Sequence, residues 1–189
     1  HALVPQPITL DEYKVYQRAI KTDPTLLGLL HEDLRAPMKC LALHTLSSKV
    51  LHLYHQKLKV MPRMFSHYHQ VIDLRLSNNQ LTQLPPEIFQ LRALRNLNLS
   101  NNQLTQLPSE ISRLNALQEL GLASNQLTHL PPEIGQLSAL TTLYLAENQL
   151  TQLPPEIGQL SALTTLYLAG NQLTHLPAEI VRLPALQKV

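Results

Sequence analysis

The chain has 189 residues and a formal net charge of +2; hydrophobic residues make up 44% of it, aromatic residues only 4%, and tryptophan is absent. It contains no run of five or more Lys or Arg residues, so the composition argues against nucleic acid or an acidic membrane surface as a partner. No stretch of 18 apolar residues occurs either, and we expect no insertion into a membrane.

The cysteine content bears on the compartment in which the protein works. Cys40 is the only cysteine, so an intramolecular disulfide is ruled out. Proteins of oxidising compartments commonly rely on disulfides. We therefore expect an intracellular, cytoplasmic location.

Residues 1–47 carry the signals of short amphipathic helices. Thr9 and Glu12 form a capping box, in which each side chain satisfies a backbone N–H group at a helix start. Asp23-Pro24 and Ala36-Pro37 mark two further helix starts. Helices this short bury little by themselves. We predict that residues 1–47 form a helical N-terminal cap over the first strand of the segment that follows.

Residues 71–185 repeat one pattern every 23 residues. Residues 140–162 and 163–185 differ at only six positions, and Leu-Pro recurs in the same register throughout. The template is L-x-x-L-x-L-x-x-N-x-L-x-x-L-P-x-E-I-x-x-L-x-A, which is that of a leucine-rich repeat. Its regular copies span residues 71–93, 94–116, 117–139, 140–162 and 163–185.

Incomplete copies stand at both ends of this series, so the repeat domain is predicted to span residues 48–189. Residues 48–70 form a degenerate copy in which Gln56 replaces the template asparagine, as expected of a terminal repeat. Residues 186–189 open a partial sixth strand of the regular series. We expect that the natural protein continues past this strand or that this end packs on something.

In each copy the central x-L-x should form a short parallel strand whose leucine points inward. The asparagine amide should satisfy backbone groups where the chain leaves the strand. Glu-Ile-x-x-Leu should form a short helical turn, with the glutamate near its positive end. The predicted fold class is α/β: a right-handed leucine-rich-repeat solenoid, or horseshoe, with a short parallel sheet on its concave face and an α-helical N-terminal cap.

Catalytic and metal-binding chemistry is not predicted. The glutamates that recur in every copy have a better explanation in the structure of the turn than in acid–base catalysis. His52 and His55 fall on the strand side of the degenerate copy, whereas His67 and His69 follow its convex side, too far away to share a metal ion. No nucleophile, phosphate-loop or zinc-protease motif occurs. We predict a protein that is not an enzyme and has no cofactor.

Outward-facing positions on the concave side vary while the frame stays constant. The first half of this surface is basic, and the second half combines acidic residues with a pair of tyrosines. Exposed Tyr and Arg side chains anchor many protein interfaces, which favours partner binding here. The alternative is that the tyrosines were merely duplicated together and face solvent. The candidate partner-binding residues are His52, Asp73, Arg75, Arg95, Asn98, Glu119, Tyr144, Glu147 and Tyr167.

With 23 residues per copy and LPxEIxxLxxL segments, residues 48–189 resemble the intracellular Ras-group leucine-rich repeats and their bacterial relatives. That resemblance implies a protein-binding solenoid, with a small GTPase as one kind of partner. The plain Q-L-T-Q-L-P-P-E-I-G-Q-L wording is similar to bacterial repeat proteins, among them effectors delivered into host cells, which implies a host signalling protein as partner.

A second resemblance concerns residues 19–62. AIKTDPTLLGLLHEDLR followed by KVLHLYHQKLKVMP resembles the segment that enters the leucine-rich repeats of the Rab geranylgeranyltransferase alpha subunit. The tryptophan-containing helical repeats of that enzyme have no counterpart in this chain, so the resemblance implies no prenyltransferase activity.

These observations lead to one hypothesis and one alternative. We hypothesise a monomeric, non-catalytic interaction module that binds a partner protein on its concave face, in the cytoplasm or, as a bacterial effector, in a host cytoplasm. The alternative is an accessory substrate-recognition domain of a larger enzyme or effector whose catalytic part lies outside this chain.

Overall fold

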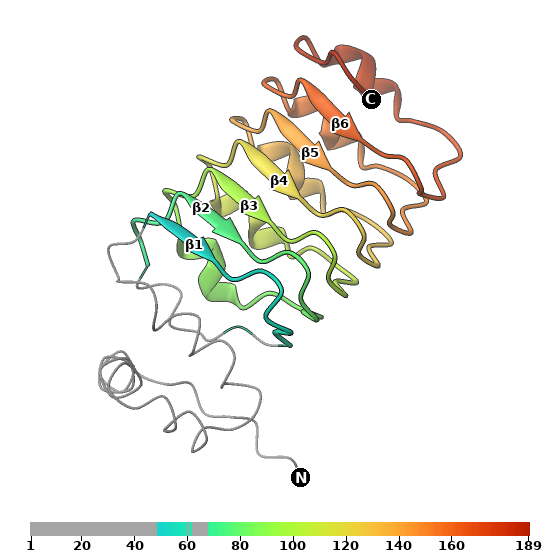
Figure 1. The fold of residues 1–189 in the computed structure, drawn as a ribbon. Coiled ribbons are helices and arrows are strands. Elements are labelled where there is room, and N and C mark those ends of the chain that lie inside the picture. Colours follow the sequence, from blue (N-terminus) through green and yellow to red (C-terminus); the bar gives the residue numbers. More distant parts are fainter. Residues whose placement is uncertain (1–48, 60, 62–67) are drawn as a thin grey trace, which may run out of the picture.

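The computed structural model describes residues 49–59, 61 and 68–189, and these residues form successive coils of one solenoid (Figure 1). The predicted helical cap over residues 1–47, and residues 60 and 62–67 of the degenerate copy, lie outside the described residues. The strands are β1 (Val50–His52), β2 (Asp73–Arg75), β3 (Asn96–Asn98), β4 (Glu119–Gly121), β5 (Thr142–Tyr144) and β6 (Thr165–Tyr167).

The six strands form one parallel sheet, in the order of the sequence. Each residue pairs with the residue 23 positions further along, as Leu51 does with Leu74 and Leu143 with Leu166. The bridge between Thr165 and Lys188 extends this register by one more coil, which agrees with the predicted partial strand at residues 186–189. The repeat period of the sequence is therefore the pairing register of the sheet.

Short 3-10 helices lie opposite the sheet in the coils of β2 to β6 (Figure 1). They begin after a proline whose ring fixes its φ, as at Pro131 with φ −68° and ψ 144°. Each carries its glutamate in the first turn, where the partial positive charge of the helix favours an acid. None of the helices in the described part of the chain is long and apolar enough to cross a membrane. The helices are η3 (Pro86–Gln90), η4 (Ser109–Arg113), η5 (Pro132–Gln136), η6 (Pro155–Gln159) and η7 (Ala178–Arg182).

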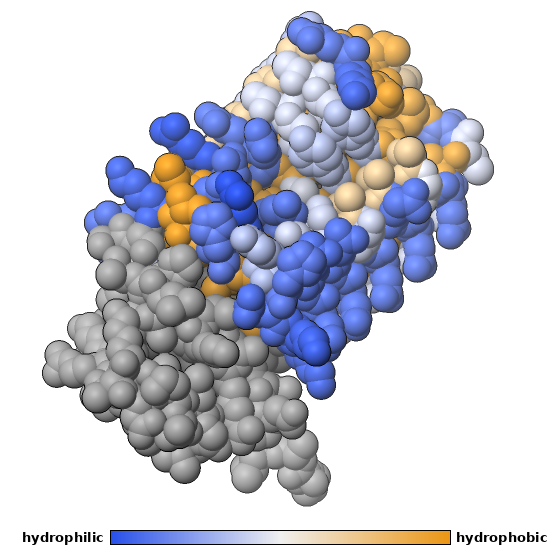
Figure 2. Space-filling view, viewed as in Figure 1, coloured by the Kyte–Doolittle hydropathy of each residue, from blue (hydrophilic) through white to orange (hydrophobic). Residues whose placement is uncertain are grey.

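The core between the strands and the 3-10 helices is a stack of leucines and isoleucines. The central leucine of every strand is at most 1% exposed. Burying a leucine side chain contributes about 1.5–3 kcal/mol, so the column of central leucines is a large part of the stability. The exposed apolar side chains Leu176, Val181 and Val189 gather at the C-terminal end of the solenoid, where no further coil covers them in this structure (Figure 2).

The recurring asparagines join neighbouring coils through buried hydrogen bonds. The Asn125 side-chain amide donates to the carbonyl oxygens of Leu122 in its own coil and Leu99 in the preceding coil, both at 3.0 Å. Its oxygen accepts from the backbone N–H of Leu104, also at 3.0 Å. Equivalent bonds form at Asn79, Asn102 and Asn148, and these four amides are only 6–8% exposed. The predicted structural role of the asparagines is confirmed.

Replacing Asn125 with Leu should destabilise the protein by about 3 kcal/mol, because the buried N–H of Leu104 loses its acceptor and two buried carbonyls each lose one of two donors. The free energy of unfolding, measured by urea denaturation, checks this. The exposed neighbour Gln126 offers a matched control, since Gln126→Leu should change stability by less than about 0.5 kcal/mol. Equal effects of the two variants would contradict the assigned role.

Replacing Leu143 with Ala should lower the free energy of unfolding by about 2–5 kcal/mol, because it leaves a cavity in the centre of β5. Leu176→Ala is the control, since that side chain is 40% exposed and little burial is lost. Thermal melts that resemble the wild type for Leu143→Ala would show that the register is wrong.

Candidate partner-binding surface

The outer side chains of β1–β6 form a continuous surface, which we call the strand face. Its first column follows the first residue of each strand, from Val50 to Thr165, and its third column follows the last residue, from His52 to Tyr167. Neighbours within a column are one strand spacing apart, about 4.8 Å. All predicted partner-binding residues lie in these columns except Arg95, which precedes β3, and Glu147, which follows β5.

Tyr144 and Tyr167 form a stacked pair in the third column. Their ring centroids are 5.0 Å apart and the ring planes are inclined by 7°. Tyr144 is 37% exposed, and Tyr167 is half-buried. Burial, and then the nearby negative charge of Glu119, raises the pKa of the Tyr144 hydroxyl above its ordinary value. The two rings thus present one rigid aromatic surface with hydroxyl groups at its rim.

Lys188 contacts this pair, although the sequence analysis did not include it among the candidates. Its Nζ atom lies 4.7 Å from the centroid of the Tyr167 ring and donates a hydrogen bond to the Tyr167 hydroxyl at 3.1 Å. The signal that could have found it is the 23-residue period, which places Lys188 beside Thr165 in the first column. A cation therefore already occupies the outer face of Tyr167.

Asp73 and Arg75 form an ion pair on β2. The Arg75 Nη2 atom donates to the Asp73 Oδ2 atom at 2.9 Å, and Nε donates to the same carboxylate at 3.2 Å. The hydrogen bond and charge of Asp73 raise the pKa of Arg75. Because the Arg75 side chain is 48% exposed, the pair adds at most about 1 kcal/mol to stability. The pair also reduces the positive charge expected in the N-terminal half of the strand face, because the Asp73 carboxylate offsets the charge of Arg75.

The N-terminal end of the strand face is aromatic as well as basic. Tyr54 is 43% exposed, and its ring meets the rings of His52 and His55 edge-on, each with centroids 5.8 Å apart. Tyr54 was not among the residues predicted from the sequence. The equivalent positions of the following coils hold small residues, such as Ser77 and Ser100, so the Tyr54 side chain projects beyond its neighbours. No group of three His, Cys, Asp or Glu residues within the described ranges could hold a metal ion.

Glu147 lies at the corner after β5, in a backbone conformation that glutamate rarely adopts. Its φ is +56°, in the left-handed region where Asn and Gly are favoured. Asn78 and Asn101 take the same conformation in their own coils, and Gly170 does so one coil later. The Glu147 carboxylate lies against Gly170, in the space that a side chain there would occupy. Glu147 thus belongs to the corner of the coil, beside the strand face.

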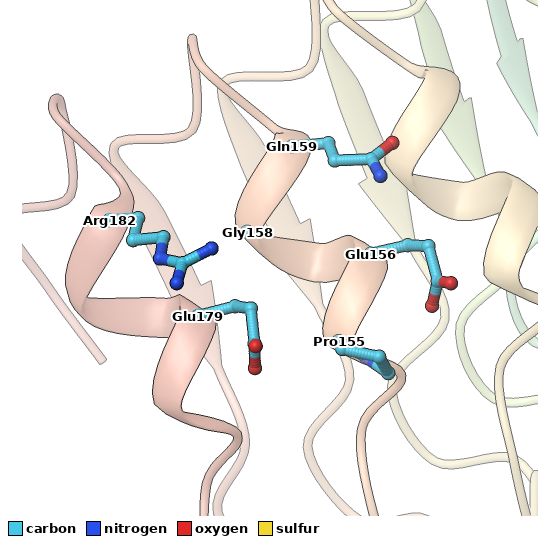
Figure 3. A pocket seen from close by; sticks show the side chains of 6 residues that line it. All are labelled: Pro155, Glu156, Gly158, Gln159, Glu179 and Arg182. Atoms are coloured by element: carbon cyan, nitrogen blue, oxygen red, sulfur yellow. The ribbon is translucent and has the colours of Figure 1, made fainter.

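A hollow of about 200 Å³ lies on the opposite side of the solenoid, between η6 and η7. Figure 3 shows the Arg182 side chain extended toward Gly158 across this hollow. A Cβ atom on Gly158 would lie 2.7 Å from the Glu179 Cβ atom, so the glycine permits the two turns to approach. Of the residues that line this hollow, Glu156 and Glu179 belong to the template, and the others stand at variable positions of the repeat.

The leucine-rich repeat family model matches residues 69–127, 117–173 and 138–189. The chain belongs to the leucine-rich repeat family. A search of curated proteins gives no match. The repeats of this chain share a constant leucine frame, whereas the exposed positions of the strand face differ from one repeat to the next.

Solved structures of leucine-rich repeat proteins are similar to the chain. A leucine-rich repeat protein of Leptospira interrogans is 41% identical, with a TM-score of 0.57 over 70% of this chain and 40% of that one. The plant peptide hormone receptor RGFR1, in complex with RGF2, is 30% identical, with a TM-score of 0.63 over 70% of this chain and 22% of the receptor.

The leucine-rich repeat domain of the type III effector XopL shares the fold. It is 23% identical, with a TM-score of 0.75 over 100% of this chain and 72% of that domain. The chain spans less than half the length of the Leptospira protein and of the plant receptor.

Replacing Glu147 with Asn should raise the free energy of unfolding by about 0.5–1 kcal/mol, because asparagine tolerates the left-handed conformation better. Urea denaturation of the two proteins measures the difference. Glu147→Gln removes the same charge but keeps the backbone strain, so it should give no gain. A loss of stability in Glu147→Asn would mean that the carboxylate contact with Gly170 outweighs the strain.

Proposed function

We propose that this leucine-rich repeat chain is a non-catalytic interaction module that binds a partner protein on its strand face. The observation that carries the proposal is the stacked pair of Tyr144 and Tyr167, a rigid aromatic surface that the leucine core does not require. Rigid aromatic side chains lose little conformational entropy on binding and are frequent anchors of interfaces. The strand face around the pair is polar and charged, as the rim of an interface commonly is.

Two features of the comparisons support a binding role and a bacterial source. Leucine-rich repeat domains are generally protein-interaction modules, and the plant receptor is solved in complex with a peptide hormone. The 41% identity with the Leptospira interrogans protein favours a bacterial chain. A cytoplasmic effector that binds a host signalling protein, such as a small GTPase, is the form of the proposal that follows from the sequence resemblance.

A second candidate is an accessory recognition domain of a larger protein. The observation that favours it is the length of the Leptospira protein, of which this chain covers 40%. In that case the strand face would select the substrate for chemistry performed elsewhere. The two candidates share the same binding surface and differ in what the remainder of the protein does.

Replacing both Tyr144 and Tyr167 with Ala should weaken partner binding by at least about 2 kcal/mol, the threshold of an interface hot spot. Neither ring is part of the leucine core, so the thermal melt should stay close to that of the wild type. The measurement is a titration of a partner, identified by proximity labelling with the intact protein, against each variant.

The control for this titration is Gln136→Ala on η5, which lies opposite the sheet and should leave the affinity unchanged. Arg75→Glu should mainly slow association and alter its salt dependence, because exposed charges steer encounters. Weaker binding in the Gln136 variant, together with unchanged binding in the tyrosine variant, would place the partner on the other face.

A further inference from the structure

A second hollow, which we call the proline hollow, lies between the coils of β4 and β5, at the corners where the chain turns into η5 and η6. Its volume is about 490 Å³, more than twice that of the hollow between η6 and η7. Ligand pockets of proteins commonly measure about 300–1,000 Å³, so a whole side chain of another molecule fits here. The proline hollow lies off the strand face, and the proposed function does not use it.

Two exposed proline rings line the proline hollow, one from each coil. Pro132 is the first residue of η5, and Pro155 is the first residue of η6. Among the described helices, these are the only neighbours that both begin with proline, because Ser109 begins η4 and Ala178 begins η7. A proline ring has no rotamer freedom to lose on contact, so both surfaces are rigid before anything binds.

Core leucines reach the surface between these rings. Leu130 and Leu153 line the proline hollow and are 4% and 5% exposed, whereas the central leucines of the strands are at most 1% exposed. The His129 ring also lines it, and its Nδ1 atom lies 3.0 Å from the Thr128 hydroxyl, which orients the ring. Apolar atoms that enter this space are removed from water, which favours binding by about 25 cal/mol per Å².

The charge at the proline hollow is negative. Glu156 lines it, and no Lys or Arg in the described part of the chain does. Figure 3 shows the Glu156 side chain extending from η6 on the side away from η7 and Arg182. The structure gives this carboxylate no hydrogen-bond or ion-pair partner among the described residues. A bound group is therefore complementary in charge if it is largely apolar and donates one hydrogen bond to Glu156.

We propose that the proline hollow binds a tryptophan side chain of a partner protein, with its ring against Pro132 and Pro155 and its indole N–H donating to Glu156. The C–H groups of proline rings suit the negative face of an aromatic ring, and indole is a hydrogen-bond donor only. The 189 residues contain no tryptophan, so a second copy of them cannot supply this side chain. The inference goes beyond the proposed function, because it needs no contact with the strand face.

Arginine and leucine side chains match this lining less well. A guanidinium would donate to the carboxylate, but it would lose hydration against proline and leucine side chains. A leucine would fill apolar space and leave the carboxylate without a donor. Tryptophan meets both demands with one rigid group.

The experiment titrates N-acetyl-tryptophanamide with the whole chain and records indole fluorescence, which is free of interference because the chain has no tryptophan. The emission should move to shorter wavelength as the ring leaves water. N-acetyl-leucinamide and N-acetyl-argininamide should displace this probe at least about tenfold less effectively than unlabelled competitor of its own kind. A derivative with a methyl group in place of the indole N–H hydrogen should bind about fivefold more weakly.

Matched variants locate the site. Pro155→Ala should weaken the probe at least about fivefold, and its fold should persist, because η7 begins with Ala178 in the same structure. Pro86→Ala is the control, since it removes the same ring from η3, whose neighbour η4 begins with Ser109. Against Glu156→Ala, the probe and its methylated derivative should bind equally, because neither then meets the carboxylate.

Several results would overturn the inference. Displacement by the leucine or arginine amide as effective as by the tryptophan amide would remove the aromatic assignment. Equal effects of Pro155→Ala and Pro86→Ala would show that the probe does not occupy the proline hollow. If Pro155→Ala fails to fold, the methylated derivative still decides: equal binding of the two probes to the wild type would contradict the bond to Glu156.

The exposed tyrosines of the strand face need a control of their own, because indole also stacks on aromatic rings. The double variant Tyr144→Ala with Tyr167→Ala should leave the affinity for the probe unchanged. Loss of binding in this variant alone would place the indole on the strand face and overturn the proline hollow as its site. The interface proposed for the strand face is tested separately, by the partner titration, so either proposal can fail without the other.

Discussion

The asparagine side chains hold this structure together in a way that the leucines alone do not. Each buried amide donates to its own coil and to the preceding coil and accepts from the preceding coil, as Asn102 does with Leu99, Leu76 and Leu81. Leucine packing is non-directional and would tolerate a sliding of one coil on the next. Hydrogen bonds of buried amides are directional, so they fix each coil at one register relative to its neighbour.

The same constraint overrides local backbone preference at the corner before each asparagine. The residue there is left-handed in every described coil, with φ from +53° to +71°, whether it is Asn101, Ser124, Glu147 or Gly170. Only some of these residue types favour that conformation. The asparagine side chain must enter the core in a fixed direction. The preceding residue adopts the φ and ψ angles that this direction requires. Strain at Glu147 is thus a consequence of the frame.

Much of the frame could be predicted from the sequence, because its period is the pairing register. The period alone indicated the strands, the buried asparagines and the adjacency of Tyr144 and Tyr167. The period did not indicate which neighbour a long side chain contacts. The contact of Lys188 with Tyr167 and the pairing of Arg75 with Asp73 depend on rotamers chosen among several neighbours, which repetition does not determine. The expected division of the strand face into a basic and an acidic half is therefore weakened, because Asp73 lies in the first half and Lys188 in the second.

A fixed register gives each outer position a constant environment, so a change in a column alters the surface without disturbing the core. Gly121 and Tyr144 stand at equivalent positions of neighbouring coils, and each is accommodated by the same strand geometry. A glycine within a strand contributes no side-chain packing and lowers strand preference. The leucine core does not require it, but the neighbouring strand does: a Cβ atom here would lie 2.9 Å from the Asn98 Oδ1 atom, which accepts a hydrogen bond from the Ser100 backbone N–H. Gly121 is therefore explained by the Asn98 side chain that packs over it, so that one member of a surface column limits the size of the next.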